Sequence, residues 1–231
     1  TTSELAVYDL AAGTVLFQGN PRWEMDERSG SADLLLVHQE SKVVSAHGNV
    51  SMKLPADSGV ESGLFQFSPT QQNTPEGAAE SLEVRARYFV FQPASENRPG
   101  YARYIGSVQL ARESSSLGCK YLNIELGGKD GGGVKQATAI GVKLLQRSDQ
   151  LTSQFAVYDF KDGAIQLNMN PTWDLNGQTG RADRVELHPD QGRFRAIGNV
   201  RMKLPKQSGG IGFIFPEQDA EKNEGTGSPL L

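Results

Sequence analysis

The residue pairs of this chain that could carry out acid–base chemistry are Asp33 with His38 and Asp183 with His188. A histidine beside a carboxylate is a common arrangement for general acid–base catalysis. A separation of five residues, however, places the two side chains of each pair on opposite faces of an extended strand. We therefore expect solvated surface histidines, and these residues predict no catalytic centre.

The other reactive groups also favour structural roles. The three histidines do not stand at metal-ligand spacing, and the single cysteine, Cys119, has no histidine in a recognisable motif beside it. The glycine-rich run at residues 127–133 lacks the Gly-Lys-Ser/Thr ending of a phosphate loop, so we interpret it as a hairpin loop. We accordingly expect no metal, no cofactor and no enzymatic activity.

Two tryptophans, Trp23 and Trp173, each follow an Asn-Pro pair. A tryptophan ring can stack on a sugar, and it can also fill a hydrophobic core. We favour the core role and keep a carbohydrate-binding or adhesive β-sandwich module as the rival hypothesis. A glycan-active enzyme on a β-sandwich is less favoured, because no paired carboxylates gather at one place in the sequence.

Composition excludes several classes of function. The formal net charge is −4, from 23 Lys and Arg against 27 Asp and Glu. The basic residues are scattered, which argues against a nucleic-acid-binding protein. No run of 18 apolar residues indicates a membrane-spanning helix. The chain of 231 residues is long enough to bury most of its apolar surface.

The sequence contains an internal repeat. Residues 5–55 recur as residues 155–205 without a gap, and 20 of the 51 positions are identical. A repeat of this length predicts an elongated scaffold or binding surface. Because neither copy could close a core alone, we expect one elongated β domain over residues 1–215, in which related strands at 82–145 join the copies. A polar tail at 216–231 would follow.

Apolar and polar residues alternate along residues 44–54 and again along residues 194–204. A period of two predicts a strand with one apolar face, which we call the inner row, and one polar face. Further strands are predicted at residues 82–92, 101–111, 120–126 and 136–145. Because no segment keeps a helical period, the sequence predicts an all-β protein of roughly 12 to 16 strands.

The order of these segments resembles the OstA-like family, which includes the LptA and LptC lipopolysaccharide-transport proteins and the N-terminal domain of LptD. Its recurrent motif is Ala-x-Gly-Asn-Val followed by alternating apolar residues, with an Ala-Asp pair upstream. The motif stands at residues 46–52 and 196–202, with Ala-Asp at 32–33 and 182–183 and weaker versions at 104–108 and 139–142.

The resemblance implies a twisted antiparallel β jelly roll, open along one side like a taco. Its apolar groove would bind the acyl chains of lipopolysaccharide or a related envelope glycolipid, in a transport or bridging role without catalysis. The resemblance also implies a periplasmic protein, free or anchored through an upstream segment. Its expected partners are further copies stacked edge to edge, or other transport-bridge proteins, but not nucleic acid.

The groove candidates are inner-row side chains of the predicted strands. They are Val15, Phe17, Val44, Val50, Met52, Leu54, Val108, Leu110, Val142, Phe194, Val200, Met202 and Leu204. A buried CH₂ group contributes about 0.8 kcal/mol. Because the net charge is negative, we expect acyl chains rather than phosphates to provide most of the affinity.

Overall fold

The computed structural model describes residues 1–25, 28–54, 81–95, 98–112, 115–127 and 133–204. Seventeen β-strands and one short 3₁₀ helix lie in these ranges, and no helix among them is long and apolar enough to cross a membrane. The all-β prediction is confirmed. The tail predicted at residues 216–231 lies outside the described residues.

The strands of the two copies occupy equivalent positions, separated by 150 residues. The first copy holds β1 (Leu5–Asp9), β2 (Thr14–Gln18), β3 (Arg22–Met25), β4 (Arg28–Ser31), β5 (Leu34–His38) and β6 (Val44–Leu54). The central strands are β7 (Leu82–Gln92), β8 (Gly100–Arg112), β9 (Ser115–Leu126) and β10 (Val134–Gln146). The second copy holds β11 (Asp149–Asp159), β12 (Ala164–Asn168), β13 (Thr172–Leu175), β14 (Gln178–Arg181), β15 (Arg184–His188), the 3₁₀ helix (Pro189–Gln191), β16 (Arg193–Ile197) and β17 (Arg201–Lys203).

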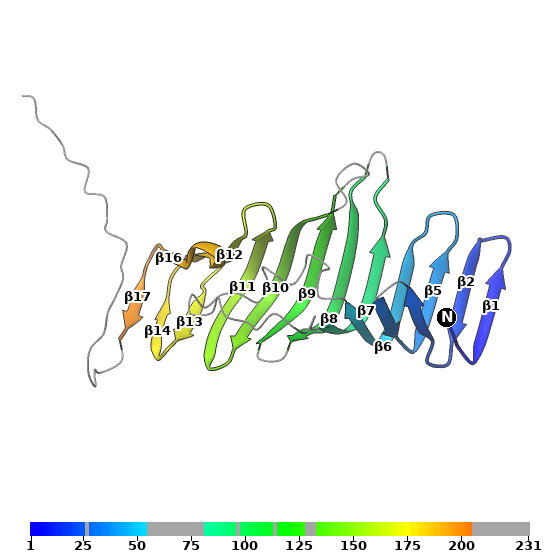
Figure 1. Cartoon of the computed structure of the whole chain (residues 1–231), viewed down its shortest axis with the longest axis horizontal. Coiled ribbons are helices and arrows are strands. Elements are labelled where there is room, and N and C mark those ends of the chain that lie inside the picture. Colours follow the sequence, from blue (N-terminus) through cyan, green and yellow to red (C-terminus); the bar gives the residue numbers. More distant parts are fainter. Residues whose placement is uncertain (26–27, 55–80, 96–97, 113–114, 128–132, 205–231) are drawn as a thin grey trace, which may run out of the picture.

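All described strand pairs are antiparallel, and they form one continuous sheet that is folded lengthwise and remains open at both ends (Figure 1). The long strands β6 to β11 run through both walls of this fold. The first half of β6 pairs with β5 and its second half pairs with β4. In the same way, β11 pairs with β12 in one wall and with β13 in the other.

We call the two walls A and B. Besides half of each central strand, wall A contains β1, β2, β5, β12, β15 and β16. Wall B contains β3, β4, β13, β14 and β17. The predicted open antiparallel jelly roll is therefore confirmed.

The bend between the walls coincides with the Gly-Asn of the recurrent motif. Gly48 and Asn49 have positive φ angles of 71° and 46°, and the register of β6 against β7 shifts at this point. In β8, Gly106 and Ser107 repeat the feature with φ angles of 82° and 52°, and Gly141 in β10 has a φ of 68°. A bulge sharpens the local bend of a strand, and glycine is the residue that adopts positive φ without steric cost. The weaker versions of the motif are thus bends of the same kind.

The core lies between the two walls. Ala46, Leu82, Leu122, Leu151 and Leu167 are each 0 % exposed. Along β6 the predicted alternation is present, because the inner row is buried from Val50 to Leu54 while the intervening Lys53 is exposed.

The equivalent segment of the second copy differs from the prediction. Residues 194–204 were expected to form a single strand, and the structure divides them into β16 and β17. In the first copy, β7 pairs with β6 along its length, from Val44 to Leu54. In the described part of the chain, β16 pairs only with β15 and β17 only with β14. Without a neighbour on its second edge, the segment is not held straight across the bend.

Candidate functional site

The predicted inner row of the central strands lies in the core. Its buried members are exposed by between 1 and 8 %, and they are Val50, Met52, Leu54, Val108, Leu110 and Val142. Three more, Val15, Phe17 and Val44, are half-buried near the N-terminal end. All of these residues except Val15 therefore belong to one hydrophobic core between the two walls.

The last four predicted residues are exposed at the C-terminal end of the sheet. The exposed fractions are 36 % for Phe194, 49 % for Val200, 44 % for Met202 and 47 % for Leu204. Their counterparts in the first copy include Val50 and Met52, at 2 and 8 %. The side chains of these two pairs are identical in type, so the difference comes from the neighbouring strand. We call these four residues the C-terminal apolar end.

The N-terminal end is exposed on the opposite flank of the repeat. Tyr8 in β1 is 49 % exposed, whereas its counterpart Tyr158 in β11 is 5 % exposed. The reason is that β10 pairs with β11, whereas β1 pairs only with β2 in the described residues. Each copy is thus covered on the flank that faces the central strands and uncovered on the other.

The interior between the walls has little free space in the middle of the molecule. A cavity lined by Leu117, Ala139, Val142 and Leu144, among others, has a volume of about 10 Å³. That is the space of about one water molecule. The inner row is therefore closely packed in the middle of the molecule and exposed at its ends.

Asp33 and Asn49 form a polar latch at the bend. The Asn49 Nδ2 atom donates hydrogen bonds to the Asp33 carboxylate oxygens at 3.2 and 3.0 Å. The Asp33 backbone N–H donates to the carbonyls of His47 and Gly48 at 3.1 and 2.9 Å. A Cβ atom at position 48 would overlap the Asp33 carboxylate, which explains the glycine. The Ala-Asp and Gly-Asn parts of the motif therefore contact each other in the folded protein.

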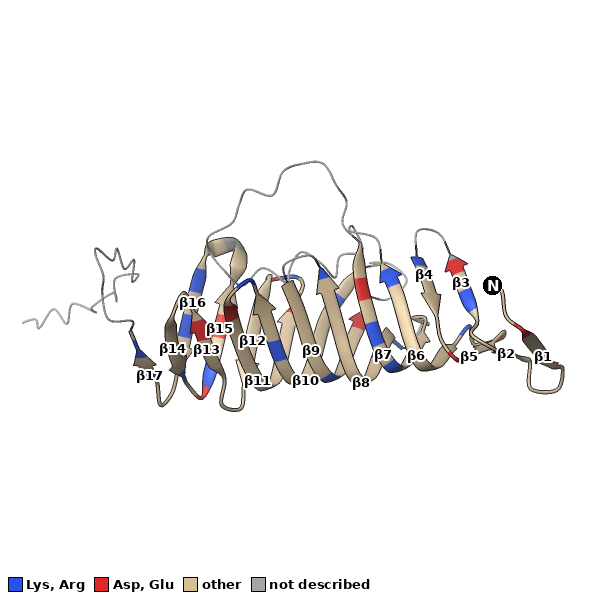
Figure 2. Cartoon of the chain, turned by 90° about the horizontal axis from the view of Figure 1, so that it is seen from below, with Lys and Arg blue, Asp and Glu red and all other residues tan. Residues whose placement is uncertain are grey.

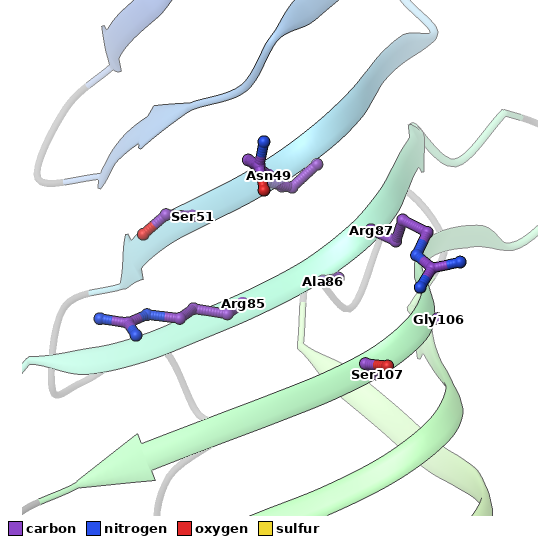
Figure 3. A pocket seen from close by; sticks show the side chains of 8 residues that line it. Asn49, Ser51, Arg85, Ala86, Arg87, Gly106 and Ser107 are labelled. Atoms are coloured by element: carbon purple, nitrogen blue, oxygen red, sulfur yellow. The ribbon is translucent and has the colours of Figure 1, made fainter.

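A hollow of about 420 Å³ lies on the outer face of the bend (Figure 3). Its polar lining includes Asn49, Ser51, Ser107, Arg85 and Arg87, and the two guanidinium groups point in opposite directions. The Arg85 side chain forms an ion pair of 2.8 Å with Glu83. The hollow lies at the bulges of β6, β7 and β8, and its lining also includes Val50 of the inner row and Ala86.

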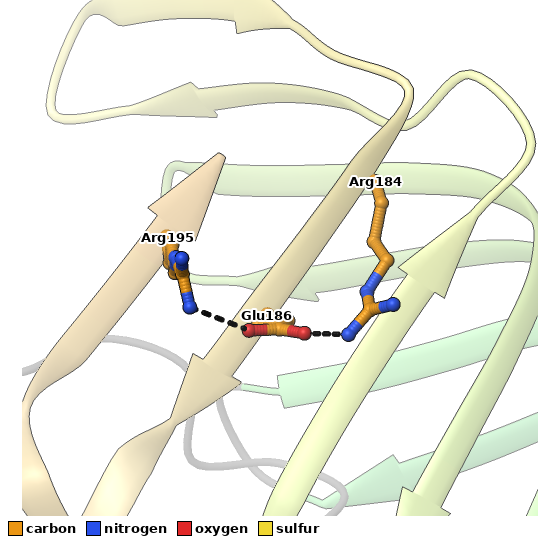
Figure 4. A network of polar contacts seen from close by, with 3 residues as sticks. All are labelled: Arg184, Glu186 and Arg195. Atoms are coloured by element: carbon orange, nitrogen blue, oxygen red, sulfur yellow. Dashed lines mark hydrogen bonds and ion pairs between the residues drawn. The ribbon is translucent and has the colours of Figure 1, made fainter. Parts of the chain in front are cut away.

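A second polar cluster lies on the outer face of wall A in the second copy. The carboxylate of Glu186 in β15 contacts Arg184 of the same strand and Arg195 of β16, the latter at 3.9 Å (Figure 4). The Glu186 side chain is 15 % exposed, whereas Arg195 is 72 % exposed. This cluster joins β15 to β16 on the outer face, while Phe194 and Ala196 of β16 lie on the inner face.

The tryptophans occupy equivalent places in the two copies. Trp173 is 5 % exposed, and its ring centroid lies 5.2 Å from that of Phe194. A Cβ atom on the cross-strand residue Gly180 would overlap the Trp173 ring. Trp23 is half-buried, packs against the core and has the same relationship to Gly30. Both rings pack onto their hairpins, which favours the predicted core role over sugar stacking.

The residues considered for acid–base chemistry do not converge. Asp33 is exposed and bonded to Asn49, and Asp183 is bonded to Asn199 at 2.8 Å. Both His38 and His188 are half-buried rather than fully solvated. Within the described residues, no three His, Cys, Asp or Glu side chains form a group that could hold a metal ion.

Cys119 lies in the core. The thiol is 7 % exposed, and burial raises its pKa from 9.0 to about 12. Since the thiolate is the reactive form, this cysteine is a packing residue at neutral pH.

The groove prediction omitted one apolar side chain at an open end. Tyr8 is the counterpart of Tyr158 and lies on the same face of its strand as the inner row. Like the C-terminal apolar end, it is exposed. The repeat itself contained the signal, because both tyrosines belong to the shared Ala-Val-Tyr-Asp segment. The exposure could not be inferred, since it depends on which copy has a strand beside it.

No family model matches the chain, and no curated protein matches it in sequence. Among solved structures, the chain is similar to LptH from Pseudomonas aeruginosa, described as the LptA homologous periplasmic component of the conserved lipopolysaccharide transport device. The sequence identity is 14 % and the TM-score is 0.44. The similarity covers 54 % of this chain and 95 % of LptH.

Proposed function

We propose that this protein is a non-enzymatic carrier of lipopolysaccharide or a related envelope glycolipid, which it binds by the acyl chains. The observation that carries the proposal is the inner row, which is continuous along the sheet and uncovered at the C-terminal apolar end. There Val200, Met202 and Leu204 are each more than 40 % exposed on consecutive inner-facing positions. Exposed apolar rows of this kind mark sites of interaction.

The same row supports a route for the lipid. The buried members from Val50 to Val142 would receive a chain only if the two walls separate, because the cavity between them is small. Methionine suits such a row, since its unbranched side chain adapts to irregular neighbours. A chain of about 12 carbons would gain roughly 8–10 kcal/mol from full burial before the ordering costs are subtracted.

The proposal includes end-to-end assembly, either with further copies or with other transport-bridge proteins. In the described part of the chain, the end strands β1 and β16 each have one edge without a pairing partner, and such edges are templates for pairing with another chain. In wall A the charges of the two ends are complementary, with exposed Arg193 and Arg195 on β16 and exposed Glu4 and Asp9 at β1. In wall B the exposed Arg201 and Lys203 of β17 correspond to exposed Arg22 and Glu24 of β3, so the charges there are mixed.

The geometry of the repeat also suits this assembly. Four strands, β7 to β10, separate β6 from β11 in the chain, and all their pairings are antiparallel. Because four is an even number, β6 and β11 run antiparallel. In the repeat, β16 corresponds to the first part of β6, and β1 corresponds to the last part of β11. β16 of one molecule could therefore pair directly with β1 of the next molecule in antiparallel orientation. Residues 1–215 would then act as one unit of a longer periplasmic scaffold.

The test compares the methionines at the equivalent positions 52 and 202 of the recurrent motif. Met202→Asp should lower the affinity for purified lipopolysaccharide at least about tenfold, because it places a charge in the acyl site. The melting temperature should change by less than about 3 °C, since Met202 is 44 % exposed. Met52→Asp should instead unfold the protein or strongly lower its melting temperature, because Met52 is 8 % exposed.

A third methionine provides the matched control. Met169 is 57 % exposed in the same copy, outside the strands of the inner row. Met169→Asp should leave both lipopolysaccharide affinity and melting temperature within error of the unmodified protein. Folded Met202→Asp that binds lipopolysaccharide as well as Met169→Asp would contradict the proposal.

A further inference from the structure

Two arginines face each other across the outer face of wall B. Arg181 in β14 and Arg201 in β17 are directly opposed partners in an antiparallel pair, and both are exposed. The Cβ atoms of such partners lie about 5 Å apart, and like charges in this relation destabilise a sheet. The pair therefore has an electrostatic cost that the fold alone does not explain.

The arginines lie at a hollow of about 400 Å³. Its other lining residues are Asn170, Thr172, Ala182, Asp183 and Asn199. Among the described residues, no carboxylate forms an ion pair with Arg181 or Arg201. Asp183 is the one acidic group of the lining, and its carboxylate accepts the hydrogen bond of Asn199. The hollow thus presents two cations, a hydroxyl, two amides and the Asp183 carboxylate to solvent.

Acidic residues are absent from the whole transverse row to which the two arginines belong. Following the registered partners across wall B, the row reads Arg22, Ser31, Ser51, Arg85, Gln109, Gly118, Lys143, Thr152, Thr172, Arg181 and Arg201. The next row contains Glu24, Glu83 and Asp174. Figure 2 shows the basic residues on the strands of wall B. No side chain within the row can neutralise Arg181 and Arg201.

The first copy shows that the fold does not need this pair. The positions equivalent to Arg181 and Arg201 are Ser31 and Ser51, which are paired in the same register between β4 and β6. The latch of Asp and Asn beside them is the same in both copies. The two arginines are therefore a feature of the second copy alone.

We propose that Arg181 and Arg201 bind a phosphate group. Phosphate accepts bidentate hydrogen bonds from guanidinium groups, and its charge would remove the repulsion between the two arginines. On β17 and the residues beside it, Arg201 and Lys203 point to the outer face while Val200, Met202 and Leu204 follow the inner row. Resting on the proposed function, this places a phosphorylated head group outside the free edge of β17 and the acyl chains inside it.

The test replaces both arginines with serine, the residue that stands at the equivalent positions of the first copy. The double variant Arg181→Ser, Arg201→Ser should bind phosphorylated lipopolysaccharide about tenfold more weakly than the unmodified protein. Its affinity for the same lipid after phosphatase treatment should be unchanged. Without ligand at low salt, its melting temperature should stay equal or rise, because the like-charge repulsion is gone. A purely structural role would predict a fall.

The control variant Arg98→Ser, Arg147→Ser makes the same change of charge at two exposed arginines away from the C-terminal end of the sheet. It should leave the affinity for both lipids within about twofold at 150 mM salt, where long-range electrostatics is screened. If the arginine pair acts only through net charge, the two double variants will weaken binding equally, and the phosphate site is overturned. Unchanged binding of phosphorylated lipid by Arg181→Ser, Arg201→Ser overturns it as well.

A third arm separates this proposal from the proposed function. Inorganic phosphate is titrated while the side-chain resonances of the arginines are followed by NMR. Saturable shifts of Arg181 and Arg201, without shifts of Arg193 and Arg195, support the site even if the protein binds neither lipid, and they would identify free phosphate as its ligand. If neither inorganic phosphate nor phosphorylated lipid perturbs these arginines, the site is overturned, whereas binding of dephosphorylated lipid would still support the carrier function.

Discussion

The Nδ2 atom of Asn199 donates a hydrogen bond of 2.8 Å to the Oδ2 atom of Asp183, at the point where the sheet folds between its two walls. The same bond joins Asn49 to Asp33 in the first copy at 3.0 Å. In both copies the glycine before the asparagine has a φ of 71° and leaves no room for a Cβ atom beside the aspartate. The repeated motif thus determines the bend of the sheet, and the inner row passes through that bend.

The first prediction concerns this glycine. Gly48→Ala should lower the free energy of unfolding by about 3 kcal/mol, because it combines a positive φ with an overlap against the Asp33 carboxylate. Gly177→Ala is the matched control, since Gly177 has a φ of 77° and no heavy atom within 4 Å of its Cβ position. It should cost only about 1 kcal/mol. Urea unfolding of both variants measures the difference, and equal costs would show that the aspartate contact contributes nothing.

The second prediction compares the tryptophans. Trp173→Ala should lower the free energy of unfolding by about 4 kcal/mol, because the ring is 5 % exposed and packs on Gly180 and Phe194. Trp23→Ala should cost less, about 2 kcal/mol, because its ring is only half-buried. Chemical denaturation gives both values. A stable Trp173→Ala variant that had lost affinity for a glycan would instead favour the adhesive module.

The third prediction concerns the two ends. Val7→Lys and Val200→Lys should each abolish self-association, because a charged lysine at the edge of a sheet disfavours pairing with another chain. The side chains of Val7 and Val200 are 47 and 49 % exposed. An equimolar mixture of the two variants should form dimers, since each retains the end that the other has lost. Sedimentation velocity over a concentration series measures this. Dimers of either variant alone would indicate a two-fold interface, and a monomeric unmodified protein would contradict self-assembly.

The fourth prediction follows from the buried thiol. Burial raises the pKa of Cys119 from 9.0 to about 12, so the unfolded thiol loses its proton above pH 9 while the folded thiol keeps it. The unfolded state then binds fewer protons, and the free energy of unfolding falls as the pH rises, by up to about 1.4 kcal/mol per pH unit. Urea unfolding between pH 8 and pH 10 tests the slope. Cys119→Ala should be less stable at pH 8 and show a flatter profile, and an identical slope in both proteins would contradict this origin.

The strands of the repeat could be predicted from the sequence because their information is local. Residues 44–54 alternate strictly between apolar and polar side chains, and the structure forms β6 over these same residues. On the equivalent strands β2 and β12, Val15 and Phe17 are half-buried and their counterparts Ile165 and Leu167 are buried. The hydrophobic period and the doubled motif determined the all-β class and the inner row.

Exposure along that row was decided only by the tertiary structure. Met52 and Met202 are equivalent residues of the recurrent motif, yet one is 8 % and the other 44 % exposed, because β7 covers the first and no described strand covers the second. The opposition of Arg181 and Arg201 is likewise invisible in the sequence, where twenty residues separate them. Alternation is a property of one strand, whereas burial and cross-strand charge depend on the neighbours that pairing brings from elsewhere in the chain.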